Sequence, residues 1–504
     1  MEPLCQKCFL QLAAPSEADP RDEKQRLLDA LPEDFGRIRM ALPVMRQLHS
    51  VCREGGWQIT VTLSWTGSGW EAVNLEPGDT SGKNYGICVD LGSTTICMRL
   101  VDLSSGRTMG QVSAYNRQIA FGEDILTRVF SSKDSPQTLE ALRQATLDTF
   151  REALEQLEEQ TGYPVKSCGA MTVAGNTTMM HFLFGLDAFG VFASPYAPCA
   201  MRFDPYPTRD AGIPLEGYLY CYPCRANYLG GDIISGLIAT GLIRESEICV
   251  FLDIGTNGEL VVGNREFLMA GAGAAGPALE GGVVKTGMRA VEGAVSYVRM
   301  EGEKFYLTVI GGGAPKGVCG SGIVDLIAQL YLNGKIDLRG KFIPESGGLE
   351  QREGEWAICY APGLYFYQSD IDAFLRTKAA ANTMVEYMLD ALGVSLDQVH
   401  KFYVAGAFGT FLDPESAVTV GLYPDLPRDR IISAGNTSLE GAHRLLCDRH
   451  SWEEADRILN TMEYVQFGEV ADFIDRMAAA SAIPHTDLSR YPSVRRKLMA
   501  RGLL

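Results

Sequence analysis

The pattern of apolar and polar residues predicts a chain of buried strands, tight turns and long amphipathic helices. Residues 85–103, YGICVDLGSTTICMRLVDL, contain two apolar segments separated by the polar stretch DLGSTT. An apolar run interrupted in this way is typical of a buried strand that turns back at the polar insert. A polar turn between two buried strands indicates a place where a small polar ligand can be held.

The same arrangement occurs a second time. Residues 247–267, EICVFLDIGTNGELVVGNREF, again place an Asp-x-Gly turn between two apolar strands, so that Asp253 corresponds to Asp90. A repeated unit of this kind is the signature of a duplicated structure. We therefore expect an α/β fold with two related domains that face one another, their two turns meeting in a cleft.

Two long helices are predicted between the strands. One begins at Pro136 behind the N-cap Ser135 and stops at Gly162, with leucines recurring on one face. The other runs from Ser369 to Gly393 with the same apolar spacing. Residues 189–224 are rich in proline and aromatics without periodicity, and we interpret them as an ordered loop over a site.

The pattern changes along the chain in a way that predicts four parts. A charged helical segment followed by two or three glycine-punctuated strands precedes the first repeat, and a short tail follows the second. The expected parts are a small N-terminal domain or linker at 1–82, a first lobe at 83–245, a second lobe at 246–480 and a C-terminal tail at 481–504.

Composition narrows the class of protein. Of the 504 residues, 46% are hydrophobic and 21% charged, as in an ordinary globular chain, and the net charge is −17. This acidity argues against nucleic acid as a partner, because phosphate contacts need clustered Lys and Arg. No secretory signal or membrane-length apolar run is present, so we expect no membrane association and a cytoplasmic location. Thirteen scattered cysteines favour a reducing compartment.

The two repeated turns have the composition of a clamp for a magnesium nucleotide. Glycines admit phosphate oxygens close to the backbone, and neighbouring N–H groups and hydroxyls can bind them. An Asp just before the turn can hold Mg²⁺, often through water. A plain hairpin explains either turn alone, but two copies in corresponding positions favour the clamp. The candidates are Asp90, Gly92, Ser93, Thr94 and Thr95 in the first turn, and Asp253, Gly255, Thr256, Asn257, Gly258 and Glu259 in the second.

Three further turns are candidates for polar contacts. Gly406 and Gly409 follow the strand KFYVA and would let an adenosine ring or ribose approach the backbone. Asn176 and Thr177 lie between an apolar strand and a helix, where helix capping by Asn176 is the competing interpretation. Glu280 lies in the glycine-rich segment MAGAGAAGPALEGG.

Two cysteine pairs have a spacing that metal sites use. Cys5 and Cys8, and likewise Cys221 and Cys224, are separated by two residues, as in zinc sites, iron–sulfur sites and redox dithiols. Together they would supply four ligands to a cluster or to zinc, and unliganded thiols are the alternative. The pattern has no Gly-x-Ser-x-Gly or His-Glu-x-x-His motif, which argues against hydrolase and metalloprotease functions, and His181 is interpreted as a packed helix residue.

An ordered series of motifs gives a resemblance to a known family. VDLGSTT, AGNTTM, GGDIISG, LDIGTNGE, AAGPALEGG, CGSGIVD, VAGAFG and SAGNTSLEGA occur in this order between residues 84 and 475. The series resembles the ATP-binding domain of the reductive activators of corrinoid proteins. These belong to the superfamily of acetate and sugar kinases, heat-shock chaperones and actin.

The resemblance implies two ribonuclease-H-like lobes with ATP and Mg²⁺ in the cleft. It implies that Asp90, Asp253 and Thr256 serve catalysis, with both aspartates organising Mg²⁺, and that Gly406 and Gly409 belong to the adenosine motif. Such activators couple ATP hydrolysis to reduction of cob(II)alamin to cob(I)alamin, which restores a methyl-transferring corrinoid protein or corrinoid methyltransferase.

The sequence differs from this family in its cysteines. Family members carry an iron–sulfur module, and neither of its usual cysteine spacings occurs here. The electron carrier is then a partner such as a ferredoxin, or a cluster on the two cysteine pairs, or it is absent because this member has a different function. A homodimer is one assembly to consider.

Two alternative functions stay open at this stage. A small-molecule kinase would use the same clamp and needs a general base, for which Asp232 and Glu280 are candidates. A nucleotide-gated binding or scaffold protein without redox chemistry is the other, because fold alone does not fix function.

Overall fold

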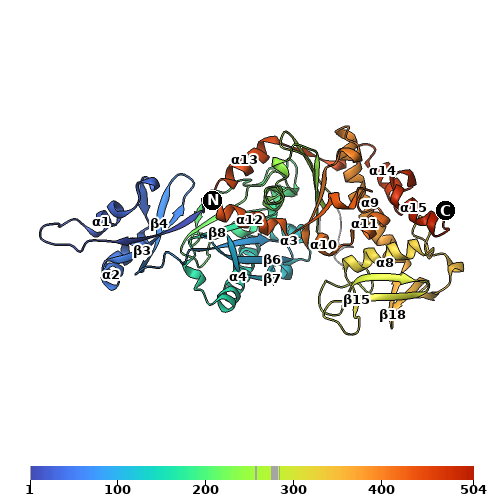
Figure 1. Cartoon of the computed structure of the whole chain (residues 1–504), viewed down its shortest axis with the longest axis horizontal. Coiled ribbons are helices and arrows are strands. Elements are labelled where there is room, and N and C mark those ends of the chain that lie inside the picture. The colour runs from blue at the N-terminus through green and yellow to red at the C-terminus, as the bar shows by residue number, and fades with distance from the viewer. Residues whose placement is uncertain (1, 256–257, 274–281, 283) are drawn as a thin grey trace. The chain divides into compact units, whose positions relative to one another are not determined.

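The chain folds into two compact units. The computed structural model describes residues 2–255, 258–273, 282 and 284–504 (Figure 1). Unit 1 is formed by Met1–Ala239 and Thr437–Asn460, and unit 2 by Thr240–Asn436 and Thr461–Leu504. The chain therefore returns from unit 2 to unit 1 for two helices, which the sequence pattern does not predict.

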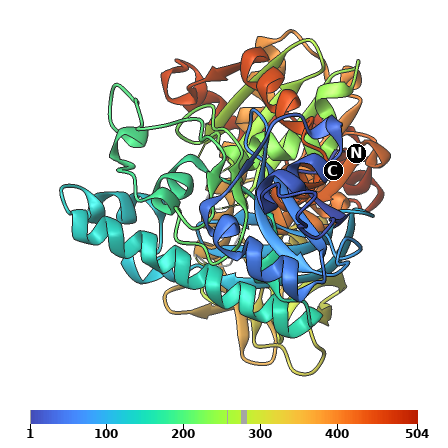
Figure 2. The same cartoon turned by 90° about the vertical axis from the view of Figure 1, so that its left-hand side faces the viewer.

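Unit 1 begins with a four-stranded sheet of order β1-β3-β4-β2, whose residues are drawn in blue in Figure 2. Its apolar residues form a core of their own, which contains Val61, Leu63 and Trp70. The first strand pairs with β3 along its whole length, although the sequence pattern predicts only helix at this position. The elements are β1 (Cys5–Gln11), α1 (Glu23–Ala30), β2 (Ile38–Met40), α2 (Leu42–Glu54), β3 (Gln58–Trp65) and β4 (Trp70–Pro77).

The main sheet of unit 1 has six strands in the order β7-β6-β5-β8-β10-β9. The first three are antiparallel, and β8 and β10 then continue parallel to β5. Helix α4 packs against β7, and α12 packs against β5 and β8. The elements are β5 (Tyr85–Leu91), β6 (Thr95–Asp102), β7 (Arg107–Tyr115), α3 (Ile125–Ser132), α4 (Pro136–Thr161), β8 (Ala170–Gly175), α5 (Thr177–Phe184), α6 (Phe189–Phe192), β9 (Tyr206–Pro207), β10 (Tyr218–Cys221), α7 (Gly231–Thr240), α12 (Thr437–Cys447) and α13 (Ser451–Thr461).

The main sheet of unit 2 repeats this topology. Its order is β21-β20-β11-β12-β13-β22, so that β11, β12 and β13 form an antiparallel meander and β20 and β21 continue parallel to β11. The predicted duplicated α/β fold is therefore confirmed. The elements are β11 (Cys249–Ile254), β12 (Gly258–Gly263), β13 (Leu268–Gly273), β20 (Lys401–Ala405), α10 (Gly406–Phe411), α11 (Pro414–Val420), β21 (Ile431–Gly435) and β22 (Met462–Val465).

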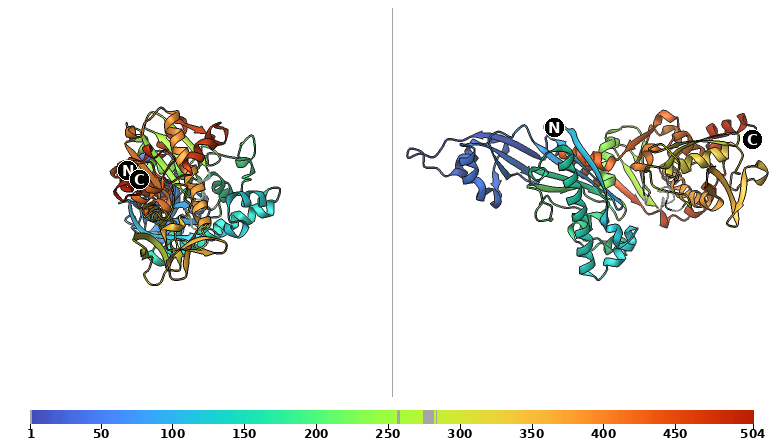
Figure 3. Two further views of the ribbon diagram at one scale, coloured as in Figure 1. Left: turned by 90° about the vertical axis from the view of Figure 1, so that its right-hand side faces the viewer. Right: turned by 90° about the horizontal axis from the view of Figure 1, so that it is seen from below.

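Two small three-stranded sheets extend unit 2 (Figure 3). Helix α8 packs against β14 of the first small sheet and against α11. These elements are β14 (Ala294–Glu301), β15 (Lys304–Val309), β16 (Gly317–Val318), α8 (Gly320–Leu332), β17 (Leu349–Arg352), β18 (Glu355–Ala361), β19 (Leu364–Tyr367), α9 (Gln368–Ala391), α14 (Phe473–Ala480) and α15 (Pro492–Ala500).

Both predicted long helices are confirmed. Helix α4 begins at Pro136, is capped by the Ser135 side chain and ends at Gly162 in the left-handed conformation. Helix α9 starts one residue before the predicted Ser369. Within the described residues, no helix combines the length and the hydropathy needed to cross a membrane.

A buried carboxylate on α8 gives a pH-dependent prediction. Asp325 is 1% exposed, and its Oδ2 accepts a hydrogen bond of 3.1 Å from the Val298 N–H. Burial raises the pKa of Asp325 to about 6, although the Val298 N–H and the nearby Ser416 hydroxyl oppose this shift. The folded chain thus binds the proton more tightly than the unfolded chain, whose aspartates titrate near pH 4.

The contribution of Asp325 to stability is therefore present below about pH 4 and is lost as the pH rises through about 6. The variant Asp325→Asn is expected to lack this loss. Its free energy of unfolding is expected to rise by about 2 kcal/mol relative to that of the natural protein when the pH is raised from about 4 to about 7. Urea unfolding at both pH values measures the difference. An equal effect of the substitution at both pH values would contradict the assignment.

Candidate functional site

The turn that follows Asp90 and Leu91 consists of residues 92–94. Hydrogen bonds to the carbonyl groups of these three residues hold it in place. The Asn116 amide Nδ2 donates to the Gly92 oxygen at 3.0 Å, and the Asn116 backbone N–H donates to the Thr94 oxygen at 2.9 Å. The Arg128 Nη1 donates to the Ser93 oxygen at 2.7 Å. All three carbonyls of the turn thus have a donor within unit 1.

This arrangement orients the amides of the turn for an anion. In a trans peptide the N–H points opposite to the C=O, so the N–H groups of Ser93 and Thr94 face away from Arg128 and Asn116. In the part of the chain that the structure describes, neither N–H has an acceptor. A Cβ at Gly92 would lie 2.4 Å from the Thr95 oxygen, so this tight turn requires glycine. Successive outward N–H groups form a concave phosphate-binding surface.

Arg128 adds a positive charge behind this turn. The side chain is fully buried, and its Nε also donates to the Gly122 oxygen at 2.8 Å. Burial lowers the pKa of Arg128 to about 10, so the guanidinium stays charged at neutral pH. Sequence reasoning missed Arg128 and Asn116, because they lie 35 and 24 residues beyond their partners and no local motif marks them.

Asp90 stands at the end of β5, directly before the turn, and is half-buried. The hydroxyl of Ser438, the second residue of α12, donates to Asp90 Oδ1 at 2.8 Å. Ser438 belongs to the motif SAGNTSLEGA, but the sequence alone does not connect it with Asp90.

The second Asp-x-Gly turn joins β11 to β12. Asp253 is half-buried and lies between Glu259 on β12 and Ala405 on β20. Gly255 ends the described part of the turn, and no atom of the described residues lies within 4 Å of the place where its side chain would begin. Gly258 and Glu259 begin β12. The predicted residues Thr256, Asn257 and Glu280 lie outside the described residues.

The structure brings the predicted adenosine glycines into unit 2 beside Asp253. Gly406 has a φ of +87°, and a Cβ there would lie 2.8 Å from Asp253 Oδ1. A Cβ at Gly409 would lie 2.7 Å from the Val404 Cγ1 on β20. Close packing therefore requires both glycines, and their contact with adenosine stays a prediction.

In the turn after β8, Asn176 has the helix-capping role that the sequence allows as the alternative to ligand contact. Asn176 caps α5 by accepting a hydrogen bond of 3.0 Å from the Met179 N–H. The Thr177 hydroxyl donates to the Ala226 oxygen at 2.7 Å. Contact of these two side chains with a nucleotide stays a prediction. His181 is a packed helix residue, as predicted: it is fully buried, and burial lowers its pKa.

The four cysteines of the two pairs do not form the metal site that their spacing suggests. Cys5 and Cys8 lie on strand β1, where residues three apart point to opposite faces. Cys5 packs beside Asn84, whereas Cys221 and Cys224 belong to the core of the main sheet. Burial raises the pKa of Cys5 and of Cys224 to about 12, so both are neutral thiols when no metal is bound.

Among the described residues, no group of three or more His, Cys, Asp or Glu side chains is arranged to hold a metal ion. Magnesium does not need such a group, because it keeps several waters and takes one or two carboxylates together with phosphate oxygens. Asp90 and Asp253, each directly before a turn, therefore fit Mg²⁺, and the cysteines do not fit a cluster.

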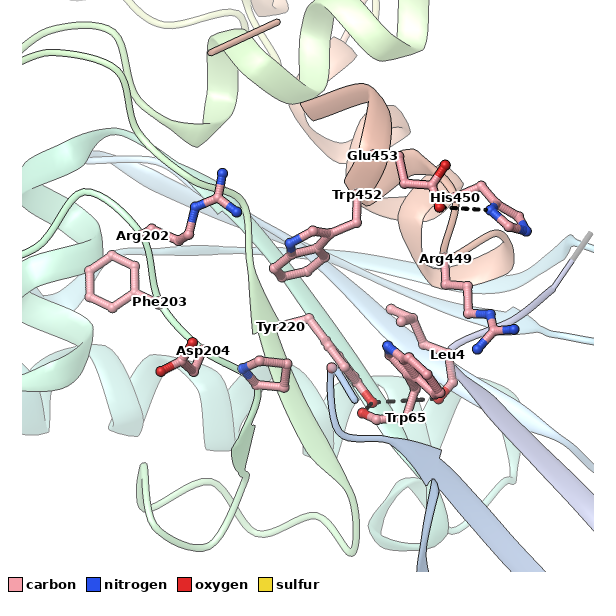
Figure 4. Close-up of a pocket in the computed structure, with 12 residues that line it drawn as sticks. Leu4, Trp65, Arg202, Phe203, Asp204, Tyr220, Arg449, His450, Trp452 and Glu453 are labelled. Atoms are coloured by element: carbon pink, nitrogen blue, oxygen red, sulfur yellow. Dashed lines mark hydrogen bonds and ion pairs between the residues drawn. The ribbon is translucent and has the colours of Figure 1, made fainter. Parts of the chain in front are cut away.

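A separate pocket of about 480 Å³ lies in unit 1 where β3, β10 and α13 meet (Figure 4). Trp65, Tyr220 and Trp452 give it aromatic walls. The Arg449 guanidinium lies 4.4 Å from the Trp65 ring centre and forms an ion pair with Glu2. The residues around this pocket contact one another and so connect the N-terminal sheet with the rest of unit 1.

The duplicated sheets and the paired Asp-x-Gly turns define the nucleotide-binding class of acetate and sugar kinases, heat-shock chaperones and actin. Comparison with known families agrees: residues 247–495 match the C-terminal ASKHA domain of RACo, 85–245 the RACo middle region and 1–82 the RACo linker region. The chain belongs to the RACo family, the reductive activators of corrinoid proteins.

Individual relatives carry consistent names. A solved structure named reductive activator for corrinoid, iron-sulfur protein is 35% identical, with a TM-score of 0.89 over 98% of this chain and 81% of its own. Corrinoid activation enzyme RamQ of Eubacterium limosum is 28% identical, over 81% of this chain and 72% of its own length. A reductase of the Co(II) methylated amine-specific corrinoid protein from Methanosarcina barkeri is 21% identical, over 74% and 72%.

Proposed function

We propose that this chain is an ATP-dependent enzyme that reduces the cob(II)alamin of a corrinoid protein or corrinoid methyltransferase to cob(I)alamin. The observation that carries the proposal is the similarity to the solved reductive activator over 98% of this chain, at 35% identity. In this proposal a low-potential donor such as a ferredoxin supplies the electron.

The two turns supply the groups that this activity needs. The outward N–H groups of Ser93 and Thr94 bind phosphate oxygens, and the buried Arg128 favours the negative charge there. Asp90 and Asp253 would hold Mg²⁺, which neutralises phosphate charge when bound. Nucleotide binding can drive an unfavourable reduction only if ATP binds two conformations with different affinity, since equal affinity shifts no equilibrium.

An anaerobic spectroscopic experiment tests the proposal. Candidate corrinoid proteins in the cob(II) state are mixed with the full chain, a low-potential reductant and Mg-ATP, and the absorption spectrum is followed. We expect conversion to cob(I)alamin with ATP and none with ADP, or without the chain. Measurable ATP hydrolysis without conversion of any candidate would reject the proposed function.

A further inference from the structure

The hydroxyl of Ser438 donates a hydrogen bond to Asp90, the aspartate of the first Asp-x-Gly turn. Ser438 is 6% exposed, and its Oγ lies 2.8 Å from Asp90 Oδ1, although the two residues are 348 positions apart. A hydrogen bond to an ionised carboxylate is shorter and stronger than one between neutral groups. Asp90 precedes Ser93 by three residues and Thr94 by four. The hydroxyl thus restrains the acidic group beside the anion-binding backbone.

Helix α12, which carries Ser438, is itself fixed to unit 1 by other contacts. The Thr172 hydroxyl on β8 donates to the Ala442 oxygen at 2.7 Å. A Cβ at Gly441 would lie 2.2 Å from the Ser235 oxygen on α7, so the two helices are in close contact. Anchoring of α12 therefore does not depend on Ser438 alone.

We propose that Ser438 is a positioning residue that holds the Asp90 carboxylate in the orientation needed to receive the magnesium ion of Mg-nucleotide. This inference rests on the proposed nucleotide site and adds a residue from α12 to it. The positive end of a helix dipole also favours a nearby anion, so the position of Asp90 beside the first turn of α12 acts in the same direction. Without the hydroxyl, Asp90 would lose a donor that selects one side-chain orientation.

The test measures equilibrium binding of ADP to the full chain by calorimetry, once with Mg²⁺ and once with EDTA. For Ser438→Ala we expect the Kd with Mg²⁺ to rise about tenfold, the typical effect of a lost hydrogen bond to a charged group. The Kd in EDTA is expected to stay unchanged. Ser438→Thr keeps the hydroxyl and is expected to bind as the natural protein does.

Thr172→Val is the matched control, since it removes a buried hydroxyl that bonds the same helix but does not contact Asp90. It is expected to leave both Kd values unchanged. An equal loss for Ser438→Ala with Mg²⁺ and in EDTA, or the same loss in Thr172→Val, would overturn the inference in favour of helix anchoring. Unaltered binding by Ser438→Ala would also overturn it. If Mg-ADP binding responds as expected but no corrinoid protein is reduced, only the proposed function fails.

Discussion

Asp253→Ala is expected to lower the rate of ATP hydrolysis at least tenfold. The carboxylate is half-buried at the end of β11, next to Gly406, whose positive φ and lack of a side chain leave room for it. Removing a group that organises Mg²⁺ removes charge stabilisation that acts on the phosphates during hydrolysis, and such losses commonly reach about 10²-fold. Phosphate release under saturating Mg-ATP measures the effect.

Asp372→Ala is a suitable control for this experiment. Asp372 is also an aspartate of unit 2, but it forms a surface ion pair with Lys341, and exposed pairs contribute little. This variant is expected to hydrolyse ATP at the natural rate, and thermal unfolding checks that both variants fold. Natural turnover in Asp253→Ala would show that Asp253 is not part of the catalytic site.

The sequence predicts well those features that local repetition encodes. The two Asp-x-Gly turns predict the duplicated sheets, because each turn is flanked by strands whose apolar residues mark them as buried. The same pattern places Asp90 and Asp253 at the ends of β5 and β11. The limits of α4 follow from Ser135, Pro136 and Gly162, which act within one helix.

Groups that act across long sequence separations are not predictable in this way. Asn116, Arg128 and Ser438 reach the first turn from elements that only the tertiary fold brings together. The cysteine spacing misleads for the related reason that two residues between cysteines suit a loop, whereas Cys5 and Cys8 lie on a strand and face opposite sides. A motif therefore predicts chemistry only after its secondary structure is known.

A buried lysine provides the largest expected effect on stability. Lys378 on α9 is fully buried, and its Nζ donates to the carbonyl oxygens of Ala480 at 2.6 Å, Ala482 at 2.7 Å and Pro484. Burial lowers the pKa of Lys378 to about 7, which shows that the ammonium is costly to bury. The hydrogen bonds to the three carbonyls offset this cost, and the Lys378 ammonium in turn supplies these buried carbonyls with a donor. The side chain thus ties α9 to the segment between α14 and α15.

Lys378→Met keeps the length of the side chain but leaves three buried carbonyls without their donor. Because each unsatisfied group costs about 1–3 kcal/mol, the free energy of unfolding of unit 2 is expected to fall by about 3–5 kcal/mol. Lys341→Met, which breaks only the exposed pair with Asp372, is expected to change it by less than about 1 kcal/mol. Urea unfolding measures both variants, and hydrogen exchange locates the loss.

Exchange is expected to accelerate first in α14 and α15, because Lys378 holds the segment that joins them to α9. Equal stability of the Lys378→Met and Lys341→Met variants would mean that the carbonyls find other donors. The inferred contribution of Lys378 to holding the C-terminal segment against α9 would then be wrong. The residues that this link joins are more than 100 positions apart in the sequence. Its strength therefore depends on the tertiary fold and is not encoded in any local sequence pattern.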